Sequence, residues 1–140
     1  MENILMTNTG MWIDVQKAVI VSVTGGVVEI ESVKSELNER QWQFAVWEIP
    51  TIVREKMLVE HLDRFYMGVS RSVLNANSIY IFGPGRAKSE FRKRLHQDKY
   101  RGSIIGVETT EAMTDLQIVN KVYARFEEQR FLESLGISNV

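Results

Sequence analysis

The sequence contains no cysteine, only two histidines and no long apolar run. Without cysteine the chain forms no disulfide, holds no metal through thiolates and offers no cysteine nucleophile. The first six residues lack the basic start and the sustained apolar stretch of a signal peptide. No apolar stretch reaches the length that a membrane span requires. We therefore expect a cytoplasmic protein with no membrane partner.

A length of 140 residues with 44% hydrophobic content predicts one domain that buries a core without disulfides. The net charge of −1 argues against polyanion binding by the chain as a whole. Residues 84–102, however, hold seven basic and two acidic residues, a net charge of +5, so the remainder carries −6. The positive charge is therefore concentrated in one short segment.

The first third of the chain has the composition of β-strands. Apolar and β-branched residues predict strands over 11–14, 18–23 and 27–33. The pair Gly25-Gly26 separates the last two strands, and glycine tolerates the positive φ of a tight hairpin turn. We expect a three-stranded antiparallel meander.

Helices alternate with strands in the rest of the chain. A helix over 51–75 follows Pro50 and carries an apolar stripe at helical spacing. The residues of this stripe are Leu58, Leu62, Phe65, Val69 and Val73. Strands over 78–82 and 103–107 flank a helix over 86–97, in which Ala87, Phe91 and Leu95 recur every four residues.

A last helix begins near Thr114, because Thr114 and Gln117 match a capping box. Five residues are expected to form its apolar face: Leu116, Val119, Val122, Tyr123 and Phe126. The residues from Glu133 to Val140 are expected to be frayed.

The predicted order is β-β-β-α-β-α-β-α in a single α/β domain. Strands joined through helices are parallel neighbours, and strands joined by hairpins are antiparallel. We therefore expect a mixed five-stranded sheet with helices on its faces, an order found in ribonuclease H-like domains. The domain is expected over 10–130, with an N-terminal extension over 1–9 and a C-terminal tail over 131–140.

Residues 35–50 fit neither pattern clearly. Trp42, Phe44 and Trp47 fall within this stretch. They either cap the sheet or form the interface of a homo-oligomer, since aromatic residues are enriched at interfaces.

The turn Gly83-Pro84-Gly85 lies between a predicted strand and a predicted helix. Such a turn can bind an anion, because unpaired N–H groups and the helix dipole favour negative charge. Arg86 and Lys88 would add to that attraction. The sequence matches neither the Walker loop nor the dinucleotide fingerprint, and a plain tight turn explains the glycines equally.

The basic residues that follow form a second candidate site. A cluster of this density can contact phosphates, although it is also compatible with an ordinary solvated helix face. Tyr100 could stack a base. The candidate phosphate- or RNA-binding residues are Gly83, Gly85, Arg86, Lys88, Arg92 and Lys93.

Carboxylates give a weaker, alternative hypothesis. Asp14 ends the first predicted strand and Glu108 the last, so a small metal-dependent hydrolase or nuclease could use both. The strand between them ends without an acid, and Asp14 equally fits a turn residue that bonds its own backbone. His61 and His96 lie far apart and are expected to be structural or surface residues. We predict no complete catalytic set, no metal site and no cofactor.

Several segments resemble one known family. The run 79–91, the run 107–118 and the sequence His61-Leu62-Asp63-Arg64-Phe65-Tyr66 are similar to the central domain of archaeal and eukaryotic peptide-chain release factors and Pelota proteins, in particular to bacterial stand-alone relatives. The resemblance covers about residues 10–126. It implies this family's fold and a translation-associated role, with the ribosome or RNA as partner.

The sequence departs from the family at the catalytic motif. Release factors hydrolyse peptidyl-tRNA through a Gly-Gly-Gln loop before the long helix, and the corresponding stretch here, Glu36 to Pro50, contains no glycine. The resemblance therefore implies a non-catalytic, RNA-contacting domain. The metal-dependent hydrolase and the homo-oligomeric interaction module stay as alternatives.

Overall fold

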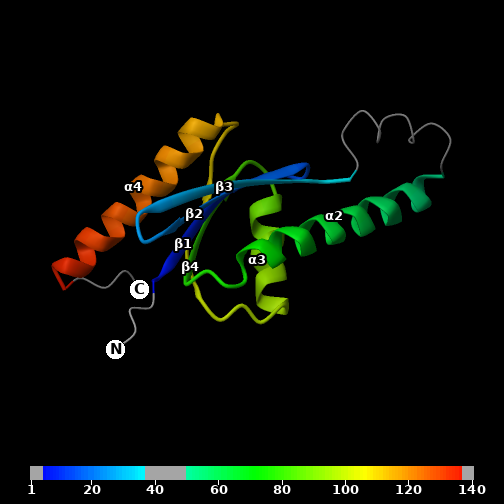
Figure 1. The fold of residues 1–140 in the computed structure, drawn as a ribbon. Coiled ribbons are helices and arrows are strands. Elements are labelled where there is room, and N and C mark those ends of the chain that lie inside the picture. Colours follow the sequence, from blue (N-terminus) through cyan, green and yellow to red (C-terminus); the bar gives the residue numbers. More distant parts are fainter. Residues whose placement is uncertain (1–4, 37–49, 137–140) are drawn as a thin grey trace.

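The computed structural model describes residues 5–36 and 50–136 (Figure 1). The eight elements follow the predicted order of strands and helices. They are β1 (Thr7–Ile13), β2 (Lys17–Thr24), β3 (Val27–Lys34), α2 (Thr51–Val73), β4 (Ser78–Gly83), α3 (Ala87–Gln97), β5 (Ser103–Thr109) and α4 (Asp115–Ser134). None of the helices in these ranges is long and apolar enough to cross a bilayer.

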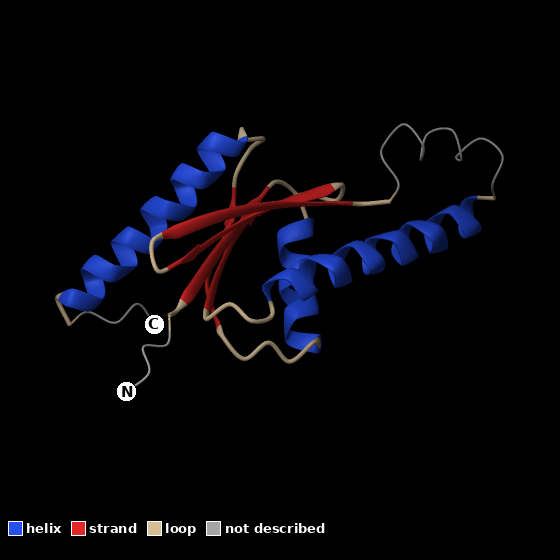
Figure 2. Cartoon of the chain, viewed as in Figure 1, coloured by secondary structure: helices blue, strands red, loops and turns tan. Residues whose placement is uncertain are grey.

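The strands form one five-stranded sheet in the order β3-β2-β1-β4-β5. β1 and β2 are antiparallel, as are β2 and β3, whereas β4 is parallel to both β1 and β5. Helices α2 and α3 cover one face and α4 covers the other (Figures 1 and 2). The predicted mixed α/β sheet is therefore confirmed.

Strand β1 begins four residues earlier than its apolar run indicates. Its first residues are polar, but they pair with polar residues of β2: the hydroxyls of Thr7 and Thr24 lie 2.9 Å apart, and those of Thr9 and Ser22 3.0 Å apart. β1 therefore reaches into the stretch predicted as an extension (1–9), and α4 likewise continues to Ser134 within the predicted tail (131–140).

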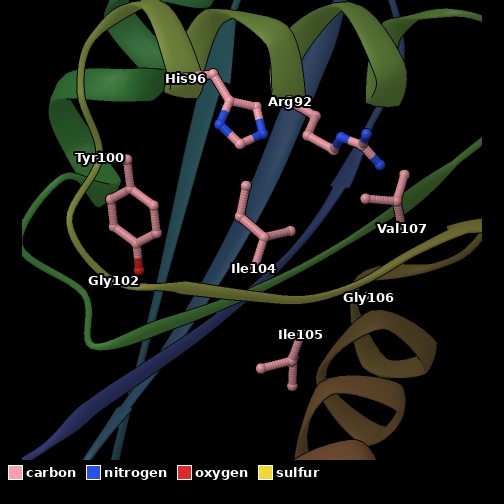
Figure 3. Close-up of a pocket in the computed structure, with 8 residues that line it drawn as sticks. All are labelled: Arg92, His96, Tyr100, Gly102, Ile104, Ile105, Gly106 and Val107. Carbon is pink, nitrogen blue, oxygen red and sulfur yellow. The ribbon is translucent and has the colours of Figure 1, made fainter. Parts of the chain in front are cut away.

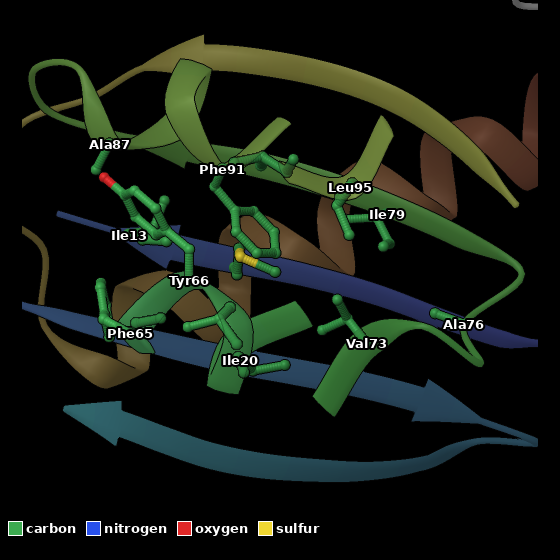
Figure 4. Packing of buried hydrophobic residues seen from close by; sticks show 14 of the residues in the cluster. Ile13, Ile20, Phe65, Tyr66, Val73, Ala76, Ile79, Ala87, Phe91 and Leu95 are labelled. Atoms are coloured by element: carbon green, nitrogen blue, oxygen red, sulfur yellow. The ribbon is translucent and has the colours of Figure 1, made fainter. Parts of the chain in front are cut away.

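The larger core lies between the sheet and helices α2 and α3 (Figure 4). The predicted stripe of α2 faces this core: Leu62, Phe65, Val69 and Val73 are buried and Leu58 is partly buried. The stripe of α3 is completely enclosed, with Ala87, Phe91 and Leu95 all at 0% exposure. Both helices therefore dock through the faces that their periodicity predicts.

The amino-terminal part of α2 projects beyond the sheet (Figure 1). Burial along this helix begins at Leu62, more than two turns after its start. Ile52 and Val59 are 77% and 64% exposed. Only the second half of α2 is therefore held by the core.

The smaller core lies under α4, and the predicted helix face is partly confirmed, since Val119, Val122 and Phe126 pack there. The capping box at Thr114 and Gln117 is present. The buried residues, however, are Ile118, Val122 and Phe126, whereas Leu116 and Tyr123 are 69% and 49% exposed. The helix packs this i, i+4, i+8 row against buried side chains of three strands. Those side chains are Trp12, Val19, Val21, Tyr80 and Phe82.

Several predictions concern residues outside the described ranges. Most of the ambiguous stretch 35–50 is among them, including Trp42, Phe44 and Trp47. The sheet-capping and homo-oligomer hypotheses for these aromatic residues therefore stay predictions.

Gly10 lets α4 approach the sheet closely. A Cβ atom at Gly10 would lie 2.4 Å from a Val122 methyl, which is far inside van der Waals contact. We expect Gly10→Ala to lower the free energy of unfolding by about 1–3 kcal/mol, the usual cost of overpacking. Urea denaturation would measure this loss.

Gly68 provides the matched control within α2. A Cβ there would meet only Val33, at an ordinary 3.8 Å. Gly68→Ala should therefore raise stability by about 0.5–1 kcal/mol through helix propensity. Equal effects of the two substitutions would contradict the packing of α4 on Gly10.

Candidate nucleic-acid interface

The charged residues of helix α3 have different neighbours, depending on their position around the helix. Its buried stripe faces the sheet. Glu90 and Arg94 contact α2, and Arg92 and His96 line a cavity beside β5. Arg86 and Lys93 are exposed. The basic segment is thus divided into a paired side and an open side.

The side toward α2 is a network of neutralised charges. The Arg94 guanidinium bonds Asp63 of α2 and, through Nε at 3.1 Å, the Asp98 carboxylate. Asp98 also accepts a 2.7 Å hydrogen bond from the Ser70 hydroxyl of α2. The Ser70 hydrogen bond and the adjacent Arg94 together hold the Asp98 pKa below its usual value.

A second contact joins the same two helices through Glu90 of α3, which also pairs with Arg86 at the start of that helix. The Tyr66 hydroxyl donates to Glu90 at 2.9 Å, and Arg86 Nε lies 3.5 Å from the same carboxylate oxygen. Burial and the hydrogen bond to Glu90 raise the pKa of Tyr66 above its usual value. Arg86 therefore has an ion-pair partner within the domain.

The Asp98 contacts predict an acid-sensitive docking of α2 on α3. A depressed folded-state pKa means that the stabilisation is complete above the unfolded value, about 3.9, and is lost as the pH falls through the folded-state pKa. Asp98→Asn should cost about 1–2 kcal/mol at pH 7, since a charge-assisted hydrogen bond is lost.

Thermal unfolding at pH 7 and at about pH 2.5 would test this. The difference between Asp98→Asn and the parent should shrink at the lower pH. Glu55→Gln, on the exposed start of α2, is the control and should change neither value. A pH-independent effect of Asp98→Asn would contradict the assigned role of the carboxylate.

The turn after β4 has a clear structural requirement. A Cβ at Gly83 would lie 2.1 Å from the Ile13 carbonyl oxygen, at a φ of 151°. Gly85 has a φ of 61°. Lys88 is 9% exposed, and its ammonium donates to the Gly85 carbonyl at 2.5 Å. The lysine thus ties the turn to α3 and does not present its charge on the surface.

Four cations of the segment 84–102 have no ion-pair partner among the described residues. Among the described residues, no carboxylate lies within ion-pair distance of Arg92, Lys93, Lys99 or Arg101, and all four are exposed. They follow one another along α3 and the loop that leads to β5. Lys99 has a φ of 57°, which turns the chain at the end of α3. We call these four residues the basic stretch.

A cavity of about 400 Å³ opens beside the basic stretch, between α3 and β5 (Figure 3). Arg92 and His96 point into it from α3, toward Ile104 and Val107 of β5. Tyr100 closes one end, where its hydroxyl donates to the Ala76 carbonyl at 2.7 Å. Burial raises the pKa of Tyr100 to about 12.

The two acids of the hydrolase hypothesis, Asp14 and Glu108, both bond other groups of the domain. Asp14 accepts hydrogen bonds of 2.8 Å from the backbone N–H groups of Gln16 and Lys17, which makes it a turn residue. Glu108 accepts from the Tyr80 hydroxyl and lies 3.5 Å from Lys121 Nζ. Strand β4 separates the strands that carry them. In the described ranges, no three acidic or histidine side chains are grouped as a metal site requires.

The histidines lie in different settings. His61 of α2 is 19% exposed, with Nδ1 3.8 Å from Glu36. His96 lines the cavity described above. The expectation of structural or surface residues fits both positions, because His61 is largely covered and His96 is exposed.

Comparison with solved structures finds the proteins that the sequence resembles. The Pelota protein of Thermoplasma acidophilum is 18% identical, with a TM-score of 0.48 over 79% of this chain and 29% of that one. The archaeal translation termination factor aRF1 is 13% identical, with a TM-score of 0.44 over 93% of this chain and 41% of that one. Pelota of Archaeoglobus fulgidus is 14% identical, with a TM-score of 0.44 over 96% and 38%.

The resemblance to release factors and Pelota proteins that the sequence predicted is thus confirmed. This chain spans well under half the length of those proteins. No protein-family model matches the chain. No curated protein matches it either. At such low identity, the similarity assigns neither an activity nor a partner to this chain.

Proposed function

We propose that this chain is a non-catalytic, translation-associated domain that contacts RNA of the ribosome through the basic stretch. The observation that supports this proposal most is that Arg92, Lys93, Lys99 and Arg101 are exposed and have no ion-pair partner among the described residues. Cations without internal partners are available to phosphates, whose neutralisation releases counterions and gives affinity. Of the residues predicted from sequence, the proposal retains Arg92 and Lys93.

The other predicted residues support the site indirectly. Gly83 and Gly85 shape the turn, and Lys88 bonds Gly85, so these residues fix the start of α3. Arg86 is paired with Glu90. The basic stretch is therefore carried by a helix that is anchored at its first turn and enclosed on its apolar side.

The process and the partner rest on the sequence resemblance to release factors and Pelota proteins. The absence of a Gly-Gly-Gln sequence anywhere in the chain supports a role without peptidyl-tRNA hydrolysis. The carboxylates of the competing hydrolase hypothesis bond their own domain, so no observation favours that alternative.

Charge reversal tests the proposal. The triple substitution Lys93→Glu, Lys99→Glu and Arg101→Glu should abolish salt-sensitive co-sedimentation with ribosomes. In binding to a single-stranded RNA, the magnitude of the slope of log K against log salt should fall by about two, since roughly 0.7 is lost for each of the three phosphate contacts.

A matched triple controls for net charge. Lys34→Glu, Lys56→Glu and Arg71→Glu reverse the same residue types at exposed positions of β3 and α2. This variant should keep most of the binding. Similar losses in both triples would show only a general charge effect, and unchanged binding in the first triple would refute the proposal.

A further inference from the structure

The outer edge of β5 has no strand beside it among the described residues. In the part of the chain that the structure describes, β5 pairs with β4 only, so its other side has no strand to bond its backbone N–H and C=O groups. One β5 carbonyl, that of Ile105, accepts a 3.2 Å hydrogen bond from Arg125 of α4. β3, at the opposite edge, likewise has no second strand beside it within the described ranges. An edge of this kind is a template for an added strand.

The two edges differ in how they are protected. β3 carries Glu29, Glu31 and Lys34, and charges of this kind discourage edge pairing. β5, with the sequence SIIGVET, carries one charged residue, and its Ile104, Ile105 and Val107 are only half-buried. Its single irregularity is a bulge at Ile105, after which Gly106 to Thr109 pair regularly with β4. β5 is therefore the edge that remains open to pairing.

A helix runs beside this edge and turns it into a groove. Arg92 and His96 of α3 point over β5, and Ile104 and Val107 form the floor (Figure 3). Of the residues that the structure describes, no acidic one lines the cavity. A strand added to β5 would therefore place every second side chain under α3, against two basic groups.

The spacing of these basic groups matches an extended chain. Residues four apart on a helix are separated by about 6 Å along its axis. Residues two apart on a strand are separated by about 6.7 Å. Acidic side chains at alternate positions of an added strand would thus meet Arg92 and His96 in turn. Adjacent acids would point to opposite faces, and only one of them would reach α3.

We propose that the groove between α3 and β5 binds an extended segment of a partner protein as an added strand, and that this segment carries acidic residues at alternate positions. Backbone pairing with β5 gives affinity. Arg92 and His96 select a segment in which two acidic residues are separated by one other residue. Arg92 belongs both to this peptide site and to the basic stretch. The RNA contact is therefore tested on Lys93, Lys99 and Arg101, which do not line the groove.

The probe is the acetylated and amidated peptide Thr-Val-Glu-Val-Glu-Val-Thr, titrated into the full chain by calorimetry. Its control, Thr-Val-Glu-Glu-Val-Val-Thr, has the same composition with adjacent acids. We expect the alternating peptide to bind about ten-fold more tightly, since one charge contact is lost in the control. Hydrogen exchange should show new protection of β5 amides and none in β3.

Substitutions locate the charge contacts. Arg92→Glu and His96→Glu should each weaken the alternating peptide by about ten-fold or more, because like charges then face each other. Arg86→Glu, on the same helix but paired with Glu90, should not change the affinity. Melting temperatures of all three variants check that the domain is still folded.

Three results would overturn the proposal. One is equal affinity for the two peptides, which would remove the alternating register. Another is protection in β3, or in neither edge, when the peptide is bound. The third is that neither peptide binds at about 1 mM. If a single-stranded RNA then protects the β5 amides, the groove is assigned to nucleic acid.

Discussion

Strand β1 is bonded on both sides, and every layer of the domain is attached through it. It pairs antiparallel with β2 and parallel with β4, so it joins the hairpin half of the sheet to the crossover half. Its side chains also serve both cores, because Met11 and Ile13 face α2 and α3 while Trp12 faces α4. Gly10 completes the strand by admitting α4 at close range. Side chains of this one strand therefore pack in the cores on both faces of the sheet.

The electrostatics of α3 follow from that placement. Arg94 is paired with Asp63 of the docked helix α2 and with Asp98 at the end of α3, and Lys88 bonds the turn after β4. Of the charges that remain, Arg92 lines the cavity beside β5, Lys99 and Arg101 lie in the loop before β5, and Lys93 is exposed on α3. A segment with a sequence charge of +5 thus keeps four exposed cations that have no ion-pair partner among the described residues.

Much of the fold could be predicted from local pattern. The stripe from Leu62 to Val73, the enclosed row of α3 and the capping box at Thr114 are all periodic or short-range signals. The start of β1 was missed because its strand character comes from hydroxyl pairs with β2, which no local pattern reveals. The face of α4 was misjudged because Leu116 and Tyr123 are apolar yet exposed.

The site was less predictable, because its chemistry depends on distant partners. The residues that neutralise Arg94 include Asp63, which lies 31 positions away in the sequence. Lys88 was predicted on the surface, although its spacing of three from Phe91 already places it near the buried side of α3. The groove beside β5 required the strand order, which places that strand at an edge.

The asymmetry of the two cores also bears on how the chain is made. The strands and the helices of the larger core all precede α4 in the sequence, so they leave the ribosome first. Until residues 115–134 follow, the face that contains Trp12, Tyr80 and Phe82 has nothing from α4 to cover it. A nascent chain at that stage carries a finished core on one side and an apolar, aggregation-prone sheet on the other.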